Sequence, residues 1–195
     1  MPDAAATAGS GDLKPSAWVQ RFASLVPSSQ ARGVLDIACG SGRHTKLFLD
    51  AGHHVVAVDH DTSGVKDLAS RLNLEITEAD LETASGWPFA NEEFAGVVVT
   101  NYLYRPILDD IVSAVAPGGA LIYETFAAGN EQFGRPKNPN FLLREGELID
   151  TVKDRLTVVA YEHGEIRAPR RAMIQRIAAV RSKRDQSHPR LDSDY

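Results

Sequence analysis

The chain has 195 residues, a formal net charge of −5 at pH 7 and a single cysteine. A chain of this length can form one α/β domain with a core of its own. Its negative charge gives no general attraction to nucleic-acid backbones, and one cysteine excludes an internal disulfide. No run of about 18 apolar residues is present to span a membrane. The sequence therefore predicts a cytoplasmic protein in a reducing compartment, without membrane contact, although a nucleic-acid or protein partner stays open.

The two ends of the chain are predicted to be flexible tails. Residues 1–12 are rich in Ala, Gly, Ser and Thr and lack periodic apolar positions, which is typical of a mobile segment. They also lack the apolar core and the basic start of a signal peptide. We therefore place one domain at residues 13–184 and a second flexible tail at residues 185–195.

The first half of the chain alternates helical and strand patterns. Helical spacing of apolar residues begins at Trp18 and ends before Pro27, whereas the apolar runs around Val34 and Val56 are typical of buried strands. The expected elements are a helix over 16–26, a strand over 33–37, a helix over 43–50, a strand over 53–59, a helix over 62–72, and strands over 74–80 and 94–100.

The second half continues the alternation and ends in two strands without a helix between them. The expected elements are a helix over 107–115 that stops at Pro117-Gly118-Gly119, a strand over 120–126, a helix over 144–153, and strands over 156–162 and 172–180. The last two strands should be antiparallel neighbours, because only a turn-rich link joins them. The predicted fold is an α/β, Rossmann-like doubly wound sheet of seven strands, mostly parallel with one antiparallel strand near the C-terminus.

A glycine-rich turn connects the first strand to the next helix. It reads Asp36-Ile37-Ala38-Cys39-Gly40-Ser41-Gly42. Gly40 and Gly42 lack a Cβ atom, so the backbone can turn tightly and a ligand can approach it closely. The helix that begins near Arg43 presents free N–H groups and the positive end of its dipole to an anionic group.

A carboxylate stands at the end of the second strand. Asp59 lies 17 residues after Gly42, which is about the distance at which a ribose-binding acid is expected. The glycine turn and Asp59 together predict an α/β enzyme that binds a nucleoside cofactor.

Four motifs, in order along the chain, resemble those of class I S-adenosylmethionine-dependent methyltransferases. Residues 34–45 resemble the first motif of this family, with Ala38 in place of the first of three alternating glycines. Asp59 resembles the acid after the second strand, Asp80-Leu81 resembles the pair after the third strand, and Pro117-Gly118-Gly119 resembles the turn before the fifth strand. The resemblance covers roughly residues 16–181. Within this superfamily the chain looks similar to small stand-alone bacterial methyltransferases, including the tellurite-resistance type.

The resemblance implies S-adenosylmethionine as the cofactor and gives roles to individual residues. In the family, the acid at Asp36 meets the amino end of the methionine, and the acid at Asp59 holds both ribose hydroxyls. The carboxylate at Asp80 takes the adenine amino group, while the N–H of Leu81 takes a ring nitrogen. The expected cofactor-binding residues are Asp36, Ala38, Gly40, Gly42, Asp59, His60, Asp80, Leu81 and Asn101. No metal site is expected, because the histidines lack metal-ligand spacing with other donors.

The implied activity is transfer of a methyl group to a small-molecule nucleophile by in-line displacement. The cofactor carries the activated methyl group, so the protein supplies alignment and desolvation. In the family the tip after the fourth strand faces that methyl group, and aromatic rings there suit a sulfonium cation. A general base is needed only where the nucleophile must lose a proton. The candidates are Tyr104, His44 and Glu124.

Residues 127–143 contain several glycines and prolines and no regular pattern. A loop of this length in a compact domain is more often functional than accidental. We expect it to form part of the wall around the methyl acceptor. Arg135 and Lys137 would suit an acceptor that carries a carboxylate or another anion, whereas a loop that only covers the sheet is the alternative.

Two other functions fit part of the pattern. An NAD(P)-dependent oxidoreductase uses a similar sheet, but its fingerprint needs glycine or alanine three residues after Gly42, where this chain has Thr45. A non-catalytic S-adenosylmethionine-binding regulator would keep the cofactor pocket and lose the acceptor side. The sequence identifies neither the acceptor atom nor the oligomeric state.

Overall fold

The computed structural model of the protein describes residues 14–28, 33–83 and 86–183. Within these ranges the helices are α1 (Ala17–Phe22), α2 (Arg43–Asp50), α3 (Leu108–Ser113) and α4 (Glu147–Val152), with 3₁₀ turns η1 (Ala23–Leu25), η2 (Thr62–Leu68), η3 (Arg105–Ile107), η4 (Asn130–Gln132) and η5 (Pro139–Phe141). The strands are β1 (Val34–Ile37), β2 (Val55–Asp59), β3 (Leu74–Glu78), β4 (Phe94–Thr100), β5 (Val115–Phe126), β6 (Thr157–Ile166) and β7 (Ala172–Val180). The predicted tails, residues 1–12 and 185–195, lie outside the described residues.

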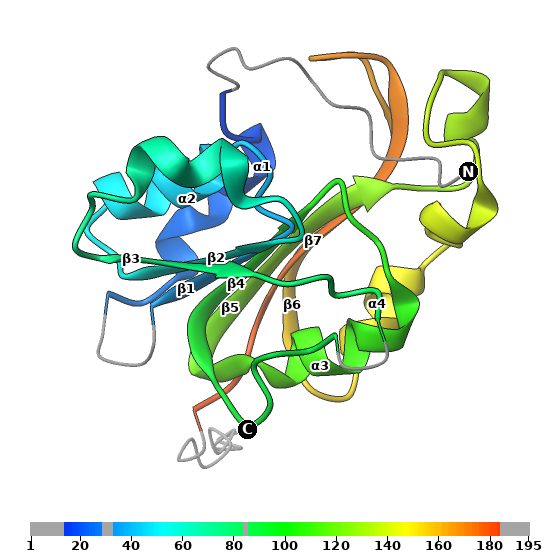
Figure 1. The fold of residues 1–195 in the computed structure, drawn as a ribbon. Helices are drawn as coiled ribbons and strands as arrows, with labels where there is room; N and C mark the ends of the chain where they lie inside the picture. The colour runs from blue at the N-terminus through cyan, green and yellow to red at the C-terminus, as the bar shows by residue number, and fades with distance from the viewer. Residues whose placement is uncertain (1–13, 29–32, 84–85, 184–195) are drawn as a thin grey trace, which may run out of the picture.

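The seven strands form one twisted sheet in the order β3-β2-β1-β4-β5-β7-β6 (Figure 1). The first five strands pair in parallel, whereas β7 runs antiparallel to both β5 and β6. The predicted fold class is therefore confirmed, including the single reversed strand and the antiparallel pairing of the last two strands.

Helices cover both faces of the sheet and form a three-layer core (Figure 1). Strand residues that point to one side pack with Trp18 and Phe22 of α1 and with Phe48 of α2. Residues that point to the other side pack with Ile111 of α3 and Leu148 of α4. Because successive strand residues alternate between faces, every central strand is buried on both sides, which explains the continuous apolar runs in the sequence.

The fifth strand begins earlier than the sequence pattern predicts. β5 starts at Val115 and continues through Pro117, Gly118 and Gly119, where a stop between helix and strand was expected. The ladder with β4 survives because its register shifts at this point and Gly118 takes a φ of +80°. A bulge of this kind accommodates glycine well, so the same residues serve inside the strand.

Three other predicted boundaries also differ. The segment after β2 is the 3₁₀ turn η2 and not an α-helix to residue 72, and its buried residues Thr62 and Val65 are three positions apart, which matches three residues per turn. The helix expected over 144–153 begins only at Glu147, after Gly146 in the left-handed region. β6 extends to Ile166, and its many exposed polar residues conceal this extension in the sequence.

Candidate active site

The glycine turn between β1 and α2 needs its two glycines for different reasons. Both have positive φ angles, +53° at Gly40 and +72° at Gly42. A Cβ at Gly42 would come within 2.6 Å of Val65 Cγ1, so this glycine lets η2 pack on the turn. Among the described residues, a Cβ at Gly40 would meet only the Ala38 carbonyl at 4.0 Å. None of these residues therefore fills the space above Gly40, where a ligand could approach.

The Asp59 carboxylate, at the end of β2, holds this turn in place. Its Oδ2 accepts a hydrogen bond from the Gly40 N–H at 2.8 Å, and its Oδ1 accepts one from the Asp61 N–H at 3.1 Å. The exposed His60 ring lies 2.9 Å from Oδ1 through its Nδ1. Asp59 is buried, at 8 % exposure. These three contacts leave about one of the four acceptor sites of the carboxylate for a ligand.

Asp36 lies below the turn and is almost fully buried, at 1 % exposure. Thr45 Oγ1 of α2 donates a hydrogen bond to Asp36 Oδ2 at 2.6 Å. Burial nevertheless dominates and raises the pKa of this carboxyl to about 6. A cationic group placed nearby would reverse that shift, because an opposite charge favours the ionised form.

The remaining predicted cofactor residues follow β3 and β4. Asp80 is exposed and its Oδ1 accepts the Glu82 N–H at 2.9 Å, whereas Leu81 is buried. Asn101 is exposed with a φ of +56°, and its N–H donates to the Glu124 carbonyl at 2.9 Å. Since β1 to β4 are parallel, the residues after their ends share the carboxyl edge of the sheet. The structure thus brings the predicted cofactor residues to one edge.

His44 is buried in the first turn of α2, and its contacts fix one tautomer. The backbone N–H of Ser16 donates to His44 Nε2 at 3.1 Å, so Nε2 carries no proton. The other nitrogen, Nδ1, lies 3.4 Å from Thr100 Oγ1 and is the nitrogen that carries the proton. Burial and the adjacent Arg43 lower the pKa of His44 to about 3, so the ring is neutral across the physiological range.

Glu124 is also held by Ser16. Ser16 Oγ donates to Glu124 Oε1 at 2.7 Å, and Arg176 Nη1 lies 3.1 Å from Glu124 Oε2. The same hydroxyl accepts the Trp18 N–H at 3.1 Å and so caps α1. One serine therefore connects the start of α1 to two of the three predicted base candidates.

Two tyrosines occupy the tip after β4. Tyr104 OH donates to the Glu82 carbonyl at 3.3 Å, while the Tyr102 carbonyl accepts from Tyr123 OH at 2.9 Å. The Tyr102 hydroxyl is buried and has no hydrogen-bond partner among the residues that the structure describes. Burial, with Glu82, Asp80 and Asp59 nearby, raises the pKa of Tyr102 above its usual value. A neutral donor thus lies near the acids of the cofactor edge.

Comparison with known protein families decides how this edge is interpreted. Residues 34–119, from β1 to the bulge in β5, match the family described as Methyltransferase domain. This part of the chain is therefore similar to a methyltransferase domain. The match includes the glycine turn, Asp59 and Asp80, and the predicted resemblance to the class I methyltransferase superfamily is confirmed.

Individual relatives agree with this assignment. Over 116 residues the chain is 27 % identical to a demethylmenaquinone methyltransferase of Renibacterium salmoninarum, a stretch that is 56 % of this chain and 48 % of the relative. The chain thus spans about half the length of the relatives that it matches by sequence.

Solved structures share the fold of the methyltransferase domain at lower sequence identity. The N-methyltransferase NodS of Bradyrhizobium japonicum WM9 aligns over 84 % of this chain and 94 % of its own, with a TM-score of 0.61 and 18 % identity. The 1,6-didemethyltoxoflavin-N1-methyltransferase of Burkholderia thailandensis, solved with its toxoflavin precursor and S-adenosylhomocysteine, aligns over 85 % of this chain and 76 % of its own, with a TM-score of 0.59 and 19 % identity.

Sequence reasoning missed Arg43, Thr100 and Ser16 as members of this edge. Arg43 Nη2 lies 3.5 Å from Thr100 Oγ1, and its guanidinium interacts with the charges of Glu124 and Asp36. Arg43 directly follows Gly42 at the start of α2, so its place was visible in the sequence. Ser16 was not, because its partners lie 28 and 108 residues away.

The loop over 127–143 begins at the end of β5, on the same edge of the methyltransferase domain. Its two ends meet in a bridge between Ala127 and Leu143, and two short 3₁₀ turns lie between them. Asn130 anchors the first part of the loop, because its side chain donates to the Pro136 carbonyl and accepts the Met173 N–H of β7. Arg135 and Lys137 are exposed.

Other surface features lie apart from the predicted cofactor residues. A cleft of about 530 Å³ is lined by residues of η3, α3 and α4, among them Leu108, Asp109 and Arg155. Within the described ranges, no group of three or more His, Cys, Asp or Glu residues could hold a metal ion. None of the helices described there is both long and apolar enough to cross a membrane.

Proposed function

We propose that the protein transfers a methyl group from S-adenosylmethionine to a nucleophilic atom of a small molecule. One observation carries the proposal. The glycine turn, Asp59 and Asp80 stand on neighbouring parallel strands of a domain that matches the methyltransferase family. Ligands of open α/β sheets bind at the carboxyl edge of the strands.

The residues present fit this cofactor. The space above Gly40 would admit the ligand close to the backbone. Asp59 keeps about one acceptor site for a ribose hydroxyl, and it would gain a second if the exposed His60 ring turned away. Asp80 and the Leu81 N–H would hold the adenine. Asp36 would meet the methionine ammonium, which accounts for a buried acid that burial alone disfavours. Arg43, at the positive end of α2, would face the carboxylate of the cofactor's methionine part.

The bound cofactor supplies a methyl group that is already activated by its positive sulfur. The protein then has to orient the acceptor and exclude water, which together account for a large part of the rate in such reactions. Where the acceptor must lose a proton, Tyr104, His44 and Glu124 remain the proposed bases. The N–H of Ser16 occupies the lone pair of His44 Nε2, and the Ser16 hydroxyl bonds Glu124 Oε1. These two groups could accept a proton only after Ser16 releases them.

The acceptor side is proposed to lie against the 127–143 loop. The Burkholderia neighbour holds a small heterocycle in its solved structure, which supports a small-molecule acceptor here. The exposed Arg135 and Lys137 favour an acceptor that carries a carboxylate or another anion.

The double replacement of Arg135 and Lys137 by alanine tests this assignment. We expect affinity for S-adenosylhomocysteine to stay within about twofold and methyl transfer to fall by about tenfold or more, the equivalent of one charge-assisted hydrogen bond. Calorimetry and a radiolabelled methyl-transfer screen over small anionic, neutral and cationic nucleophiles provide the two measurements. Lys153→Ala, which removes an exposed lysine paired with Asp150 on α4, is the matched control. Normal turnover in the double variant would make the loop a cover only.

The oxidoreductase alternative is not supported by the structure. Thr45, at the position where a dinucleotide fingerprint needs a small residue, is fully buried and bonded to Asp36. The methyl-transfer screen also distinguishes an enzyme from a non-catalytic regulator, because a regulator would bind S-adenosylmethionine without methylating any acceptor.

A further inference from the structure

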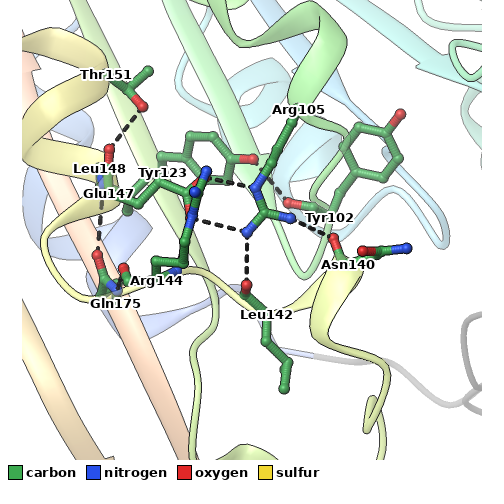
Figure 2. A network of polar contacts seen from close by, with 10 residues as sticks. All are labelled: Tyr102, Arg105, Tyr123, Asn140, Leu142, Arg144, Glu147, Leu148, Thr151 and Gln175. Atoms are coloured by element: carbon green, nitrogen blue, oxygen red, sulfur yellow. Dashed lines mark hydrogen bonds and ion pairs between the residues drawn. The ribbon is translucent and has the colours of Figure 1, made fainter.

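The side chain of Arg105 contacts the end of the 127–143 loop and the start of α4. It begins η3, directly after the two tyrosines of the β4 tip. Its Nε and Nη2 lie 2.6 and 2.9 Å from the two carboxylate oxygens of Glu147. Its Nη1 donates to the Asn140 carbonyl and its Nη2 to the Leu142 carbonyl, both at 2.8 Å (Figure 2). One guanidinium therefore joins the β4 tip, η5 and the start of α4.

Arg105 and Glu147 stay ionised at this junction. Glu147 is 9 % exposed, and burial by itself would raise its pKa. The hydrogen bonds from Arg105 and from the Arg144 N–H outweigh burial and hold the pKa at about 2. The same carboxylate raises the pKa of Arg105. Both groups are therefore ionised at every pH at which the protein would work.

The segment that Arg105 contacts, residues 140–147, is also bonded to β7. The fully buried Gln175 donates its amide to the Arg144 carbonyl (Figure 2). Its Oε1 also accepts the Tyr161 hydroxyl at 3.1 Å. Leu143 donates its N–H to the Phe126 carbonyl of β5 at 2.9 Å. Residues 140–147 are thus held by β5 and β7. Leu143 also packs in the same apolar cluster as Leu103 of the β4 tip, and among the hydrogen bonds and ion pairs of the described residues it is those of Arg105 that connect this segment to the tip.

We propose that Arg105 is a positioning residue, which sets the acceptor-side loop at a fixed place relative to the β4 tip. The inference rests on the proposed function in one respect, that residues 127–143 form the acceptor wall. A lysine cannot replace this arginine, because a single ammonium lacks the planar fork that bonds two carboxylate oxygens and two carbonyls together. Cofactor binding should not depend on Arg105, since all four of its bonds go to the loop and α4.

Loop mobility in Arg105→Lys gives a direct test. A nitroxide label is attached at Lys137→Cys, in the exposed middle of the loop. The native Cys39 is buried and its thiol pKa is raised by burial, so it should not compete for the label. Arg155→Lys is the matched control, because Arg155 also joins two elements through a pair with Asp109, at 2.7 Å on the exposed side of α3.

A mobile component should appear in the label spectrum of Arg105→Lys and not in that of Arg155→Lys, while affinity for S-adenosylhomocysteine stays within about twofold in both. With an acceptor from the screen, KM for that acceptor should rise by about tenfold and kcat should change by less than about threefold. If Arg105→Lys folds poorly, Glu147→Gln removes the same ion pair and is measured in the same way.

Two results would overturn this role. An unchanged label spectrum would show that Arg105 does not hold the loop, and a cofactor affinity weakened by about tenfold would place Arg105 in the cofactor site. A loosened loop with unchanged KM would overturn the acceptor role of the loop. Failure of the wild-type protein to bind S-adenosylhomocysteine would instead contradict the proposed function, so the two failures are distinguishable.

Discussion

Asp36 and Glu147 are both buried carboxylic acids, yet their surroundings move their pKa values in opposite directions. The hydroxyl and N–H of Thr45 and the charge of Arg43 only partly offset the burial of Asp36, so its pKa rises to about 6. Glu147 accepts bonds from two arginines, and its pKa falls to about 2. The difference follows from the number of cationic donors within reach, and it gives the two residues opposite effects on stability as the pH changes.

Asp36→Asn should remove the free-energy cost of burying an ionised carboxylate, which the unliganded protein bears at neutral pH. In the wild type the folded pKa lies above the unfolded value of 3.8, so stability is lost as the pH rises from about 4 to 6. Relative to the wild type, the variant should gain up to about 3 kcal/mol of unfolding free energy between pH 4 and pH 8. Urea unfolding at several pH values measures this gain. A difference that does not depend on pH would contradict the assigned shift.

Glu147→Gln should show the reverse dependence. The folded pKa is depressed, so the carboxylate stabilises the protein fully above its unfolded value of 4.5 and loses this effect as the pH falls toward about 2. The variant should be less stable than the wild type by up to about 3 kcal/mol at pH 7, and the difference should shrink below pH 4.5. Thermal unfolding from pH 7 to pH 3 provides the check, and a constant difference would argue against the ion pair with Arg105.

The positions of single residues were predictable where a motif states them. The distance of Asp59 from Gly42 predicts a ribose-binding acid, and the structure places Asp59 beside the glycine turn, at the carboxyl edge of the sheet. Its hydrogen bond to the Gly40 N–H was not predictable, because no local pattern encodes a contact between two strand ends. An Asp59→Ala variant would therefore lose a support of the turn in addition to a ligand contact.

At the scale of elements, α1 depends on one serine. Ser16 caps the helix and bonds both His44 and Glu124. Ser16→Ala should cost about 1 kcal/mol through the lost cap and hydroxyl bond, which corresponds to a fall of about 2–4 °C in Tm for a domain of this size. Differential scanning calorimetry compares it with Ser113→Ala, whose exposed hydroxyl donates to the Asp109 carbonyl of its own helix and accepts a long bond of 3.4 Å from the exposed Arg155. Equal Tm values for both variants would show that α1 is anchored elsewhere.

Element boundaries were less predictable than element types. The strand and helix order was correct because apolar runs and helical spacing are strong local signals. The early start of β5 was missed, since Pro117-Gly118-Gly119 is typical of a stop and only pairing with β4 reveals the bulge. The full length of β6 was missed for the same reason, as its pairing with β7 and not its composition makes it a strand.

At the scale of the whole molecule, the parallel strands matter because they bring distant residues to one edge. Residues 36 and 59 lie near the ends of β1 and β2, whereas residues 80 and 101 follow β3 and β4. The strand order β3-β2-β1-β4 makes them neighbours. Family motifs allowed this arrangement to be predicted. The contacts made by Ser16 and Arg105 join parts of the chain that no motif connects, which is why the sequence did not indicate them.

Calorimetric titration of the wild-type protein with S-adenosylhomocysteine, and in parallel with NADH, tests the central claim most directly. Asp36, Gly40, Asp59 and Asp80 should together hold the methylated and demethylated cofactor with a Kd in the micromolar range, about −8 kcal/mol. NADH should give no binding heat, and Asp59→Asn should weaken S-adenosylhomocysteine binding by about tenfold, the loss of one charge-assisted hydrogen bond. Binding of NADH without binding of S-adenosylhomocysteine would contradict the account.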